Sequence, residues 1–208
     1  MSEQMADMQQ LFSRQAALQQ EANEVRTSLH LDDLLRTAGE PVLVGSAALG
    51  LMVWEDLDLT VTCDSLDLVQ VLDIGRSLAS HPDVHTLTFR NDTGRWNVER
   101  DRYPDGLYLG VRYQQEGRAE WKLDLWFVDE PERQPDLRHL RTLPPRLTEQ
   151  NRQAILAIKS AWHRRPEYGV QVTSADIYAA VIDDGVQDIV GFDQWLRRRT
   201  GDGEMLNQ

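Results

Sequence analysis

The sequence predicts an α+β fold in which a short β-sheet is flanked by helices, with a helix at the N-terminus and a helical C-terminal part. An N-terminal stretch without Gly or Pro carries apolar residues at helical spacing. A central region alternates apolar with polar residues, as half-buried strands do, and the spacing becomes helical again beyond a Pro-bearing segment. The predicted parts are an N-terminal helical segment (residues 1–38), a core (39–130) and a C-terminal helical segment (131–208).

Two helices are expected before the first strand. The first covers residues 2–26 and the second covers residues 30–37, where Ser28 or Asp32 would cap the N-terminus and Gly39 would end the helical part. The apolar stripe of the first helix is interpreted as a packing face, against the core or against another chain. A homodimer is therefore one expected assembly.

Five segments have the pattern of strands, and a helix over residues 65–80 is expected between the second and the third. The His-Pro pair that follows ends this helix. The stretch Gln-Gln-Glu-Gly-Arg is expected to join the last two strands as a hairpin. The predicted strands cover residues 41–44, 56–63, 84–90, 107–114 and 119–128.

The C-terminal part is expected to be helical after a Pro-bearing connection over residues 130–145. The strongest apolar periodicity lies in residues 148–164. Two shorter helices are expected over residues 174–182 and 187–199.

Composition excludes several classes of protein. Lys plus Arg is 22 and Asp plus Glu is 34, so the net charge is −12. DNA and RNA binding need a basic face, so nucleic acid is disfavoured as a partner, whereas cations and amines are favoured. The single cysteine, Cys63, excludes an internal disulfide and a multi-Cys zinc site. No apolar run approaches the ~20 residues of a membrane span, and no signal peptide is evident, so a cytoplasmic protein is expected.

The most informative pattern lies in residues 42–61. An apolar strand ends at Gly45-Ser46, and a second strand begins with Asp56-Leu-Asp58. Because positions i and i+2 of a strand share a face, Asp56 and Asp58 project together. Two adjacent carboxylates repel each other unless a cation lies between them, and Mg²⁺ prefers such oxygen ligands. The alternative is a solvated acidic pair without a ligand.

A third carboxylate, Asp124, lies in the middle of the apolar strand Trp-Lys-Leu-Asp-Leu-Trp-Phe. It shares a face with Lys122 and Trp126. An acid in such a strand is costly unless it is paired or binds metal, so pairing with Lys122 or an Arg is the alternative to a catalytic role. Three such Asp residues could support two metal ions ~3.5–4 Å apart.

The Gly45-Ser46 turn has the features of an anion site. Gly45 would let the backbone approach a phosphate closely. The N–H groups that start a helix over residues 47–52 would face the anion. Ser46 would add a hydroxyl contact or cap that helix. An ordinary strand-ending turn would have the same sequence.

Taken together, the apolar strand, Gly45-Ser46, the Asp56 and Asp58 pair and the distant Asp124 resemble the DNA polymerase β-like nucleotidyltransferase superfamily, above all its minimal and antibiotic-modifying members. The resemblance covers residues 41–128. It implies a short mixed β-sheet flanked by helices, with a helical C-terminal part that helps to bind substrate. It also implies transfer of a nucleoside monophosphate from an NTP such as ATP to an acceptor hydroxyl, with release of pyrophosphate.

The resemblance also implies residue roles. Asp56 and Asp58 would hold Mg²⁺, and Asp124 would be the third ligand and general base. Many small members carry an Arg or Lys soon after the Gly-Ser turn, but residues 47–53 are uncharged here, so other residues must meet the triphosphate. The candidates are Lys122, Lys159, Arg95, Arg100 and Arg102, with a snorkelling surface lysine as the alternative for Lys159.

The acceptor stays open at this point. A cationic small molecule, such as an aminoglycoside-like compound, fits the net charge, and a protein hydroxyl is a further possibility. The aromatic residues Trp96, Trp121, Trp126 and Tyr108 could stack a base, although such residues in strands more often pack. A second hypothesis is a catalytically silent nucleotidyltransferase-like module for binding or assembly, for example in a toxin–antitoxin system. The uncharged turn and the long N-terminal helix favour that hypothesis.

Overall fold

The computed structural model describes residues 3–204, with side-chain surroundings for residues 6–199. The chain divides into two compact units. One, called the sheet unit here, is Ala16–Leu143. The other, called the helical unit, combines Met1–Gln15 with Pro144–Gln208.

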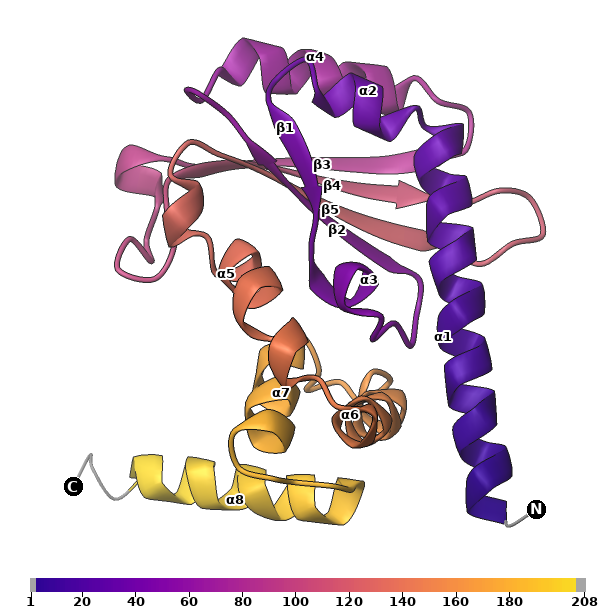
Figure 1. Cartoon of the computed structure of the whole chain (residues 1–208). Coiled ribbons are helices and arrows are strands. Elements are labelled where there is room, and N and C mark those ends of the chain that lie inside the picture. Colours follow the sequence, from indigo (N-terminus) through magenta and orange to yellow (C-terminus); the bar gives the residue numbers. More distant parts are fainter. Residues whose placement is uncertain (1–2, 205–208) are drawn as a thin grey trace. The chain divides into compact units, whose positions relative to one another are not determined.

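The sheet unit is built on a five-stranded mixed sheet in the order β1-β2-β5-β4-β3 (Figure 1). β2 and β5 are parallel, and the other neighbouring pairs are antiparallel. The predicted α+β class with a short mixed sheet is thus confirmed, and each predicted strand is present within two residues of its expected ends. The strands are β1 (Glu40–Leu43), β2 (Asp56–Thr62), β3 (Val84–Asp92), β4 (Gly106–Tyr113) and β5 (Trp121–Val128).

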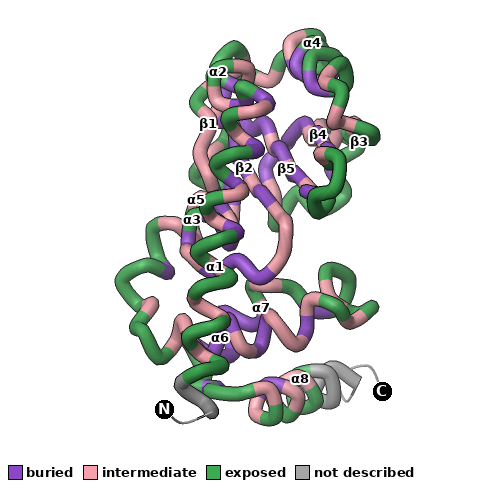
Figure 2. The backbone as a smooth tube through the Cα atoms, turned by 90° about the vertical axis from the view of Figure 1, so that its right-hand side faces the viewer, coloured by how far each residue is buried: buried purple, intermediate pink, exposed green. Residues whose placement is uncertain are grey.

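One face of this sheet carries the hydrophobic core. Leucines such as Leu57, Leu109 and Leu125 alternate along β2, β4 and β5 with residues of the opposite face, and they point to the core. They pack against the second half of α1 (Glu3–Ser28), against α2 (Leu31–Leu35) and against α4 (Leu68–Ala79). Figure 2 shows the buried colour concentrated on these strands. The apolar stripe of α1, from Leu18 to Leu29, is therefore a packing face against the core.

The predicted caps of α2 are wrong. His30 is the N-cap residue, in a left-handed conformation with φ 46°, and its side chain caps nothing. Asp32 is instead held in an ion pair with Arg26, 2.9 Å away. In α4, Asp67 is the N-cap and accepts hydrogen bonds from the backbone N–H groups of Val69 and Gln70.

The other face of the sheet is flanked by α3 (Gly45–Leu49) and α5 (Pro135–Thr142) (Figure 1). The sequence did not predict α5, because its prolines were interpreted as a break. Pro135 lies in the first turn, where its missing N–H has no helical partner to lose and its fixed φ suits the helix. This helix brings Asp136 into the sheet unit.

The helical unit contains α6 (Glu149–Trp162), α7 (Ser174–Ile182) and α8 (Ile189–Glu204), which confirms the three predicted C-terminal helices. Thr148 caps α6, and Thr173 with Asp176 forms a reciprocal capping box on α7. Among the helices that the structure describes, none combines the length and apolarity that a membrane crossing requires.

Candidate active site

Three aspartates converge on the polar face of the sheet. β2 and β5 are parallel neighbours, and their register places Asp58 beside Asp124 and Asp56 beside Lys122. Each of the three aspartates offers a carboxylate oxygen, and these oxygens all lie within 4.8 Å of one another. We call Asp56, Asp58 and Asp124 the Asp triad. The structure thus brings together the three carboxylates that the sequence singled out.

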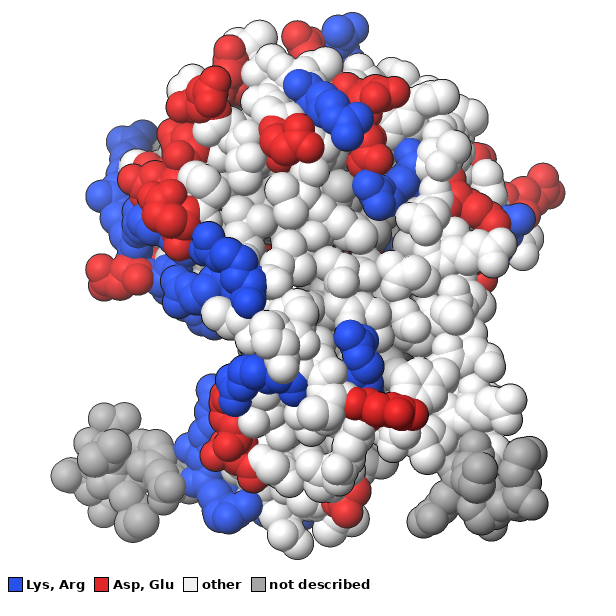
Figure 3. Space-filling view, viewed as in Figure 1, with Lys and Arg blue, Asp and Glu red and all other residues white. Residues whose placement is uncertain are grey.

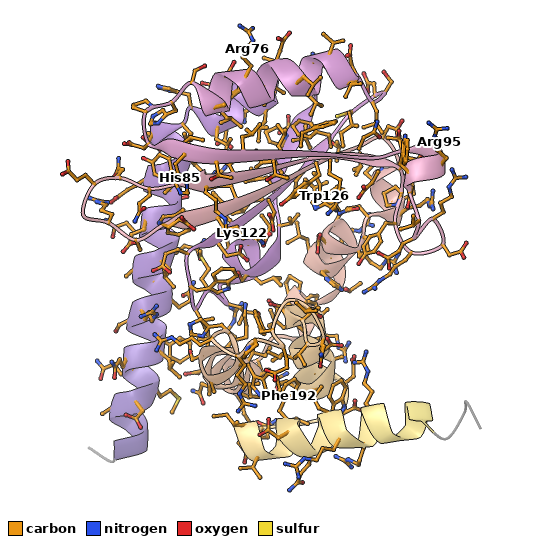
Figure 4. All side chains as sticks on the ribbon, turned by 180° about the vertical axis from the view of Figure 1, so that it is seen from behind. Arg76, His85, Arg95, Lys122, Trp126 and Phe192 are labelled. Carbon is orange, nitrogen blue, oxygen red and sulfur yellow. The ribbon has the colours of Figure 1, made fainter. Side chains whose placement is uncertain are left out.

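The Asp triad lies opposite the hydrophobic core, because its members alternate with Leu57, Leu59 and the apolar residues of β5. The Asp56 and Asp124 side chains are 15% and 17% exposed. A ligand can therefore reach carboxylates that are partly withdrawn from water. Figure 4 labels Lys122 and Trp126 on β5, to either side of Asp124 in sequence.

Lys122 supplies a positive charge inside this cluster. Its Nζ lies 2.5 Å from Asp124 Oδ2 and 3.6 Å from Asp56 Oδ1. Burial lowers the pKa of Lys122, but Asp56 and Asp124 together raise it by more, so the net pKa lies above its ordinary value. The side chain is therefore an ammonium at neutral pH. It also lies 5.9 Å from the centre of the Trp54 ring, which precedes the acidic pair.

Asp58 has a strongly perturbed pKa. Burial raises its pKa well above the ordinary value, and the charges of Asp56 and Asp124 raise it further, while Lys122 opposes them. Burial and mutual repulsion therefore both disfavour the fully ionised state of the three carboxylates. A divalent cation is the kind of ligand that would relieve this repulsion.

This repulsion leads to a prediction on stability. The pKa of Asp58 is higher in the folded chain than in the unfolded chain, where it is about 4. Its contribution to stability is therefore present at low pH and is lost as the pH rises through the folded pKa. Without divalent ions, we expect Asp58→Asn to melt a few degrees above the wild type at pH 8, with a smaller gain at pH 5.

Melting curves from pH 5 to 8.5 in a chelator measure this difference. Asp64→Asn is the control, because Asp64 is an exposed carboxyl of the same unit and lies outside the triad. Lower stability of Asp58→Asn at pH 8 would contradict the electrostatic account.

The position of Asp58 leaves room only for a glycine at residue 45. Its φ of 62° is left-handed, and a Cβ built on it would lie 2.3 Å from Asp58 Oδ2. The backbone of the turn therefore approaches the carboxylate as closely as a residue without a side chain allows. Ser46 is buried beside it.

The helix after this turn begins earlier than predicted. α3 starts at Gly45 with Val44 as its N-cap, and no side chain caps it. The possibility that Ser46 is the N-cap is therefore wrong, because Ser46 already lies inside the first turn. The helix ends at Leu49, where Gly50 adopts the left-handed conformation that terminates helices.

Tyr108 makes a contact at the site that sequence reasoning missed, since the sequence suggested only that its ring could stack a base. Its hydroxyl donates a 2.7 Å hydrogen bond to Asp124 Oδ1. The residue opposite Asp124 on β4 is Gly110, and a Cβ there would lie 2.5 Å from the Tyr108 hydroxyl oxygen. The sequence does show Tyr108 and Gly110 two residues apart, and therefore on one face of a predicted strand. Their position opposite Asp124, however, depends on the register between β4 and β5. Tyr108 and Lys122 together fix the orientation of the Asp124 carboxylate.

Asp136 was also missed, because its helix was not predicted. Burial raises the pKa of Asp136, and its charge contributes to the raised pKa of Asp58. It is therefore a fourth acid whose field reaches the Asp triad.

The basic residues proposed for the triphosphate lie in different places. Arg95 lies over the Trp96 ring, 4.5 Å from its centre, and Arg102 lies 3.7 Å from Glu99; both belong to the β3–β4 loop, as does Arg100. Lys159, on α6, is 1% exposed, so the surface-lysine alternative is wrong. Its Nζ lies 3.5 Å from the Tyr178 hydroxyl oxygen.

Comparison with solved structures identifies the fold. An RNA terminal U-transferase described as cytoplasmic superposes with a TM-score of 0.54 at 17% identity, over 83% of this chain and 53% of that one. Cid1, in complex with its short product ApU, superposes with a TM-score of 0.53 at 17% identity, over 83% of this chain and 48% of that one. A further Cid1 structure, described as an RNA terminal uridylyl transferase, superposes with a TM-score of 0.55 at 19% identity, over 78% of this chain and 46% of that one.

These likenesses confirm the predicted resemblance to the fold of the DNA polymerase β-like nucleotidyltransferases. The chain spans about half the length of the solved chains it matches. No family model and no curated protein sequence matches the chain.

Proposed function

We propose that this chain is a metal-dependent nucleotidyltransferase that transfers a nucleoside monophosphate from an NTP to an acceptor hydroxyl and releases pyrophosphate. The observation that carries the proposal is the convergence of the Asp triad within 4.8 Å on a fold of this class. Phosphoryl-type transfer depends on positioning and on neutralising charge more than on covalent chemistry by the protein. An acidic cluster beside a glycine turn suits both demands.

The donor set fits Mg²⁺. Asp56, Asp58 and Asp124 would hold it, because carboxylate oxygens are the ligands that this hard cation prefers and because these oxygens lie within 4.8 Å of one another. When bound, such an ion neutralises charge on the phosphates and lowers the pKa of an oxygen that it contacts.

In this mechanism Asp124 acts as the base. Its carboxylate takes the proton from the acceptor hydroxyl as the oxygen attacks the α-phosphorus in line. A new P–O bond forms, the bond from the α-phosphorus to the bridging oxygen breaks, and pyrophosphate leaves with that electron pair. Tyr108 and Lys122 hold the Asp124 carboxylate in place through their bonds to its two oxygens.

The triphosphate would be held by the glycine turn and by Lys122. The backbone at Gly45-Ser46 lies against Asp58, so a phosphate bound there would be next to the metal ligands. Lys122 already lies in the cluster as an ammonium. Lys159 belongs to the helical unit, so the proposal rests on the residues of the sheet unit alone.

A catalytically silent binding module is the second candidate, and Lys122 is the observation that favours it. A lysine that contacts both Asp56 and Asp124 neutralises part of the cluster without any metal. In a silent module this ion pair would be the final state of the site.

Nucleotide-dependent stabilisation tests the proposal. With ATP and Mg²⁺ at about 100 times the dissociation constant, an enzyme of this kind gains about 2.7 kcal/mol, or roughly 5–10 °C in melting temperature. We expect EDTA to abolish the gain and Asp56→Asn to remove most of it. Asp64→Asn should behave as the wild type. Equal melting temperatures with and without each of the four NTPs would instead support the silent module.

A further inference from the structure

Helix α4 leaves a group of apolar side chains exposed on the surface of the sheet unit. Val69 is 68% exposed, Leu72 is 45% exposed and Leu68 is 43% exposed. The three lie within five residues at the start of the helix, at spacings that place them next to one another. The buried side of α4, with Val71 and Leu78, packs into the core. We call Leu68, Val69 and Leu72 the α4 ridge. Adjoining exposed apolar residues of this kind are a candidate interaction surface.

A groove of about 400 Å³ runs beside the α4 ridge, between α2 and α4. Leu34 of α2 and Val69 and Ile74 of α4 give it apolar walls. The Gln70 side chain of α4 donates a hydrogen bond to the carbonyl oxygen of Thr37, which follows α2, so the two walls are linked in the free chain. Figure 1 shows α2 and α4 side by side over the sheet, at the top of the view. We call this space the α4 groove.

The dimensions of the α4 groove fit a helix. Its lining on the α4 side extends from Asp67 to Ser77, a rise of about 15 Å, which is the length of roughly three helical turns. The walls are mostly helical, so most of their backbone N–H and C=O groups are already bonded and an added β-strand would find few partners. A partner helix needs only apolar side chains on one face, and these would enter the groove beside the α4 ridge.

The α4 groove carries acidic charge. Two acids, Asp67 and Asp73, and no base occur among the described residues that line it. Asp33 of α2 adds an exposed carboxylate beside the groove. Arg36 lies 3.3 Å from Asp33 and Arg76 lies 3.2 Å from Asp73. Both pairs are largely exposed, so they are weak and a partner's basic side chains can compete with them.

This charge favours one occupant over two others. In a two-fold dimer through this face, Asp67 and Asp73 of one copy would meet the same acids of the other. Anionic phospholipids would be repelled for the same reason. A helix that carries Lys and Arg is attracted instead. Figure 3 shows acidic side chains and uncharged surface over α2 and α4, at the top of the view, with basic side chains beside some of the acids.

We propose that the α4 ridge and the α4 groove bind an amphipathic helix of a partner protein, and that the polar face of this helix is rich in Lys and Arg. Its apolar side chains pack on Val69 and enter the groove against Leu34 and Ile74, while its basic side chains meet Asp67 and Asp73. α4 covers the core face of the sheet, whereas the Asp triad lies on the opposite face, so a bound helix leaves the triad accessible. The inference is therefore independent of the proposed nucleotidyltransferase function, and its test needs no activity.

Fluorescence anisotropy of labelled peptides, titrated with the full chain, tests the inference. The first probe is a synthetic peptide of about 14 residues, roughly four helical turns, with Leu on one face and Lys on the other. The second has the same composition in an order that gives no apolar face, and the third carries Glu in place of Lys. We expect the first peptide to bind the wild type at least tenfold more tightly than either of the others.

Variants of the α4 ridge and groove locate the binding. Val69→Lys removes an apolar contact and adds a like charge, so we expect it to weaken the first peptide about tenfold or more. Val170→Lys is the matched control, because Val170 is also a largely exposed valine but belongs to the helical unit. Asp67→Asn keeps the cap of α4, because Asn caps helices about as well as Asp. Combined with Asp73→Asn, it should weaken binding and reduce its salt dependence, and circular dichroism checks that the variants stay folded.

Several results would overturn the inference. Equal affinity for the second peptide, or wild-type affinity in Val69→Lys, would show that binding follows net charge and not the α4 ridge. Equal affinity for the Glu peptide would remove the charge argument. Sedimentation velocity and cosedimentation with phosphatidylcholine–phosphatidylserine vesicles examine the other occupants. A dimer that Val69→Lys dissociates would assign the ridge to a second copy of this chain, and vesicle binding that Val69→Lys abolishes would assign it to a membrane surface.

Discussion

Replacing Asp58 with Asn is expected to lower kcat/KM for nucleotide transfer by on the order of 10³-fold or more. Asn keeps the shape of the side chain but removes the charge that a divalent ion requires. Asp58 lies between the glycine turn and Asp124, so both the metal and the phosphate position depend on it. Pyrophosphate release from ATP, measured with an acceptor that supports turnover by the wild type, gives the rate.

Asp58→Asn is expected to stay folded, so its loss of activity can be assigned to the site and not to unfolding. Asp58→Asn relieves repulsion among three carboxylates, so a folded and inactive protein is expected. Asp56→Asn should show the same loss of activity, and Asp64→Asn should retain the wild-type rate. Wild-type rates in both Asp56→Asn and Asp58→Asn would refute the metal assignment.

Gly45→Ala is expected to remove activity through a single methyl group. The added Cβ would lie 2.3 Å from Asp58 Oδ2, so the turn or the carboxylate must move. The left-handed φ of 62° adds a backbone cost of about 1–2 kcal/mol for any residue with a Cβ. We expect a loss of activity of at least 10²-fold, on the order seen when one transition-state contact is lost, together with reduced stability in urea unfolding.

Gly117→Ala separates these two effects. Gly117, in the β4–β5 hairpin, has a φ of 73°, and a Cβ there would meet nothing within 4 Å. It should lose similar stability from its backbone conformation and keep full activity. Equal activity in Gly45→Ala and Gly117→Ala would show that the turn does not position Asp58.

The pairing of Asp56 with Asp58 could be predicted, because the alternation of apolar and polar residues along a strand can be seen in the sequence. Asp56 and Asp58 share a face by their spacing alone, and Leu57 must then face the core. The position of Asp124 beside Asp58 depends on the parallel pairing of β2 with β5. No local pattern encodes that pairing, so only the resemblance to a known family suggested it.

Other features of the site were missed for related reasons. Tyr108 touches Asp124 through the register of β4 on β5, and a strand pattern shows faces without showing register. Asp136 was missed because residues 130–145 were interpreted as a Pro-bearing connection, whereas Pro135 begins a helix. The burial of Lys159 depends on tertiary packing, which periodicity on one helix does not reveal.

The strand order has a consequence for biosynthesis. β5 is the last strand to be translated, yet it lies at the centre of the sheet, between β2 and β4. Until residue 128 has emerged from the ribosome, the β1–β2 and β3–β4 pairs each lack their central neighbour, and the edges of β2 and β4 stay open. Insertion of β5 joins the two halves and places Asp124 beside Asp58, so the sheet and the acidic cluster are completed by the same strand.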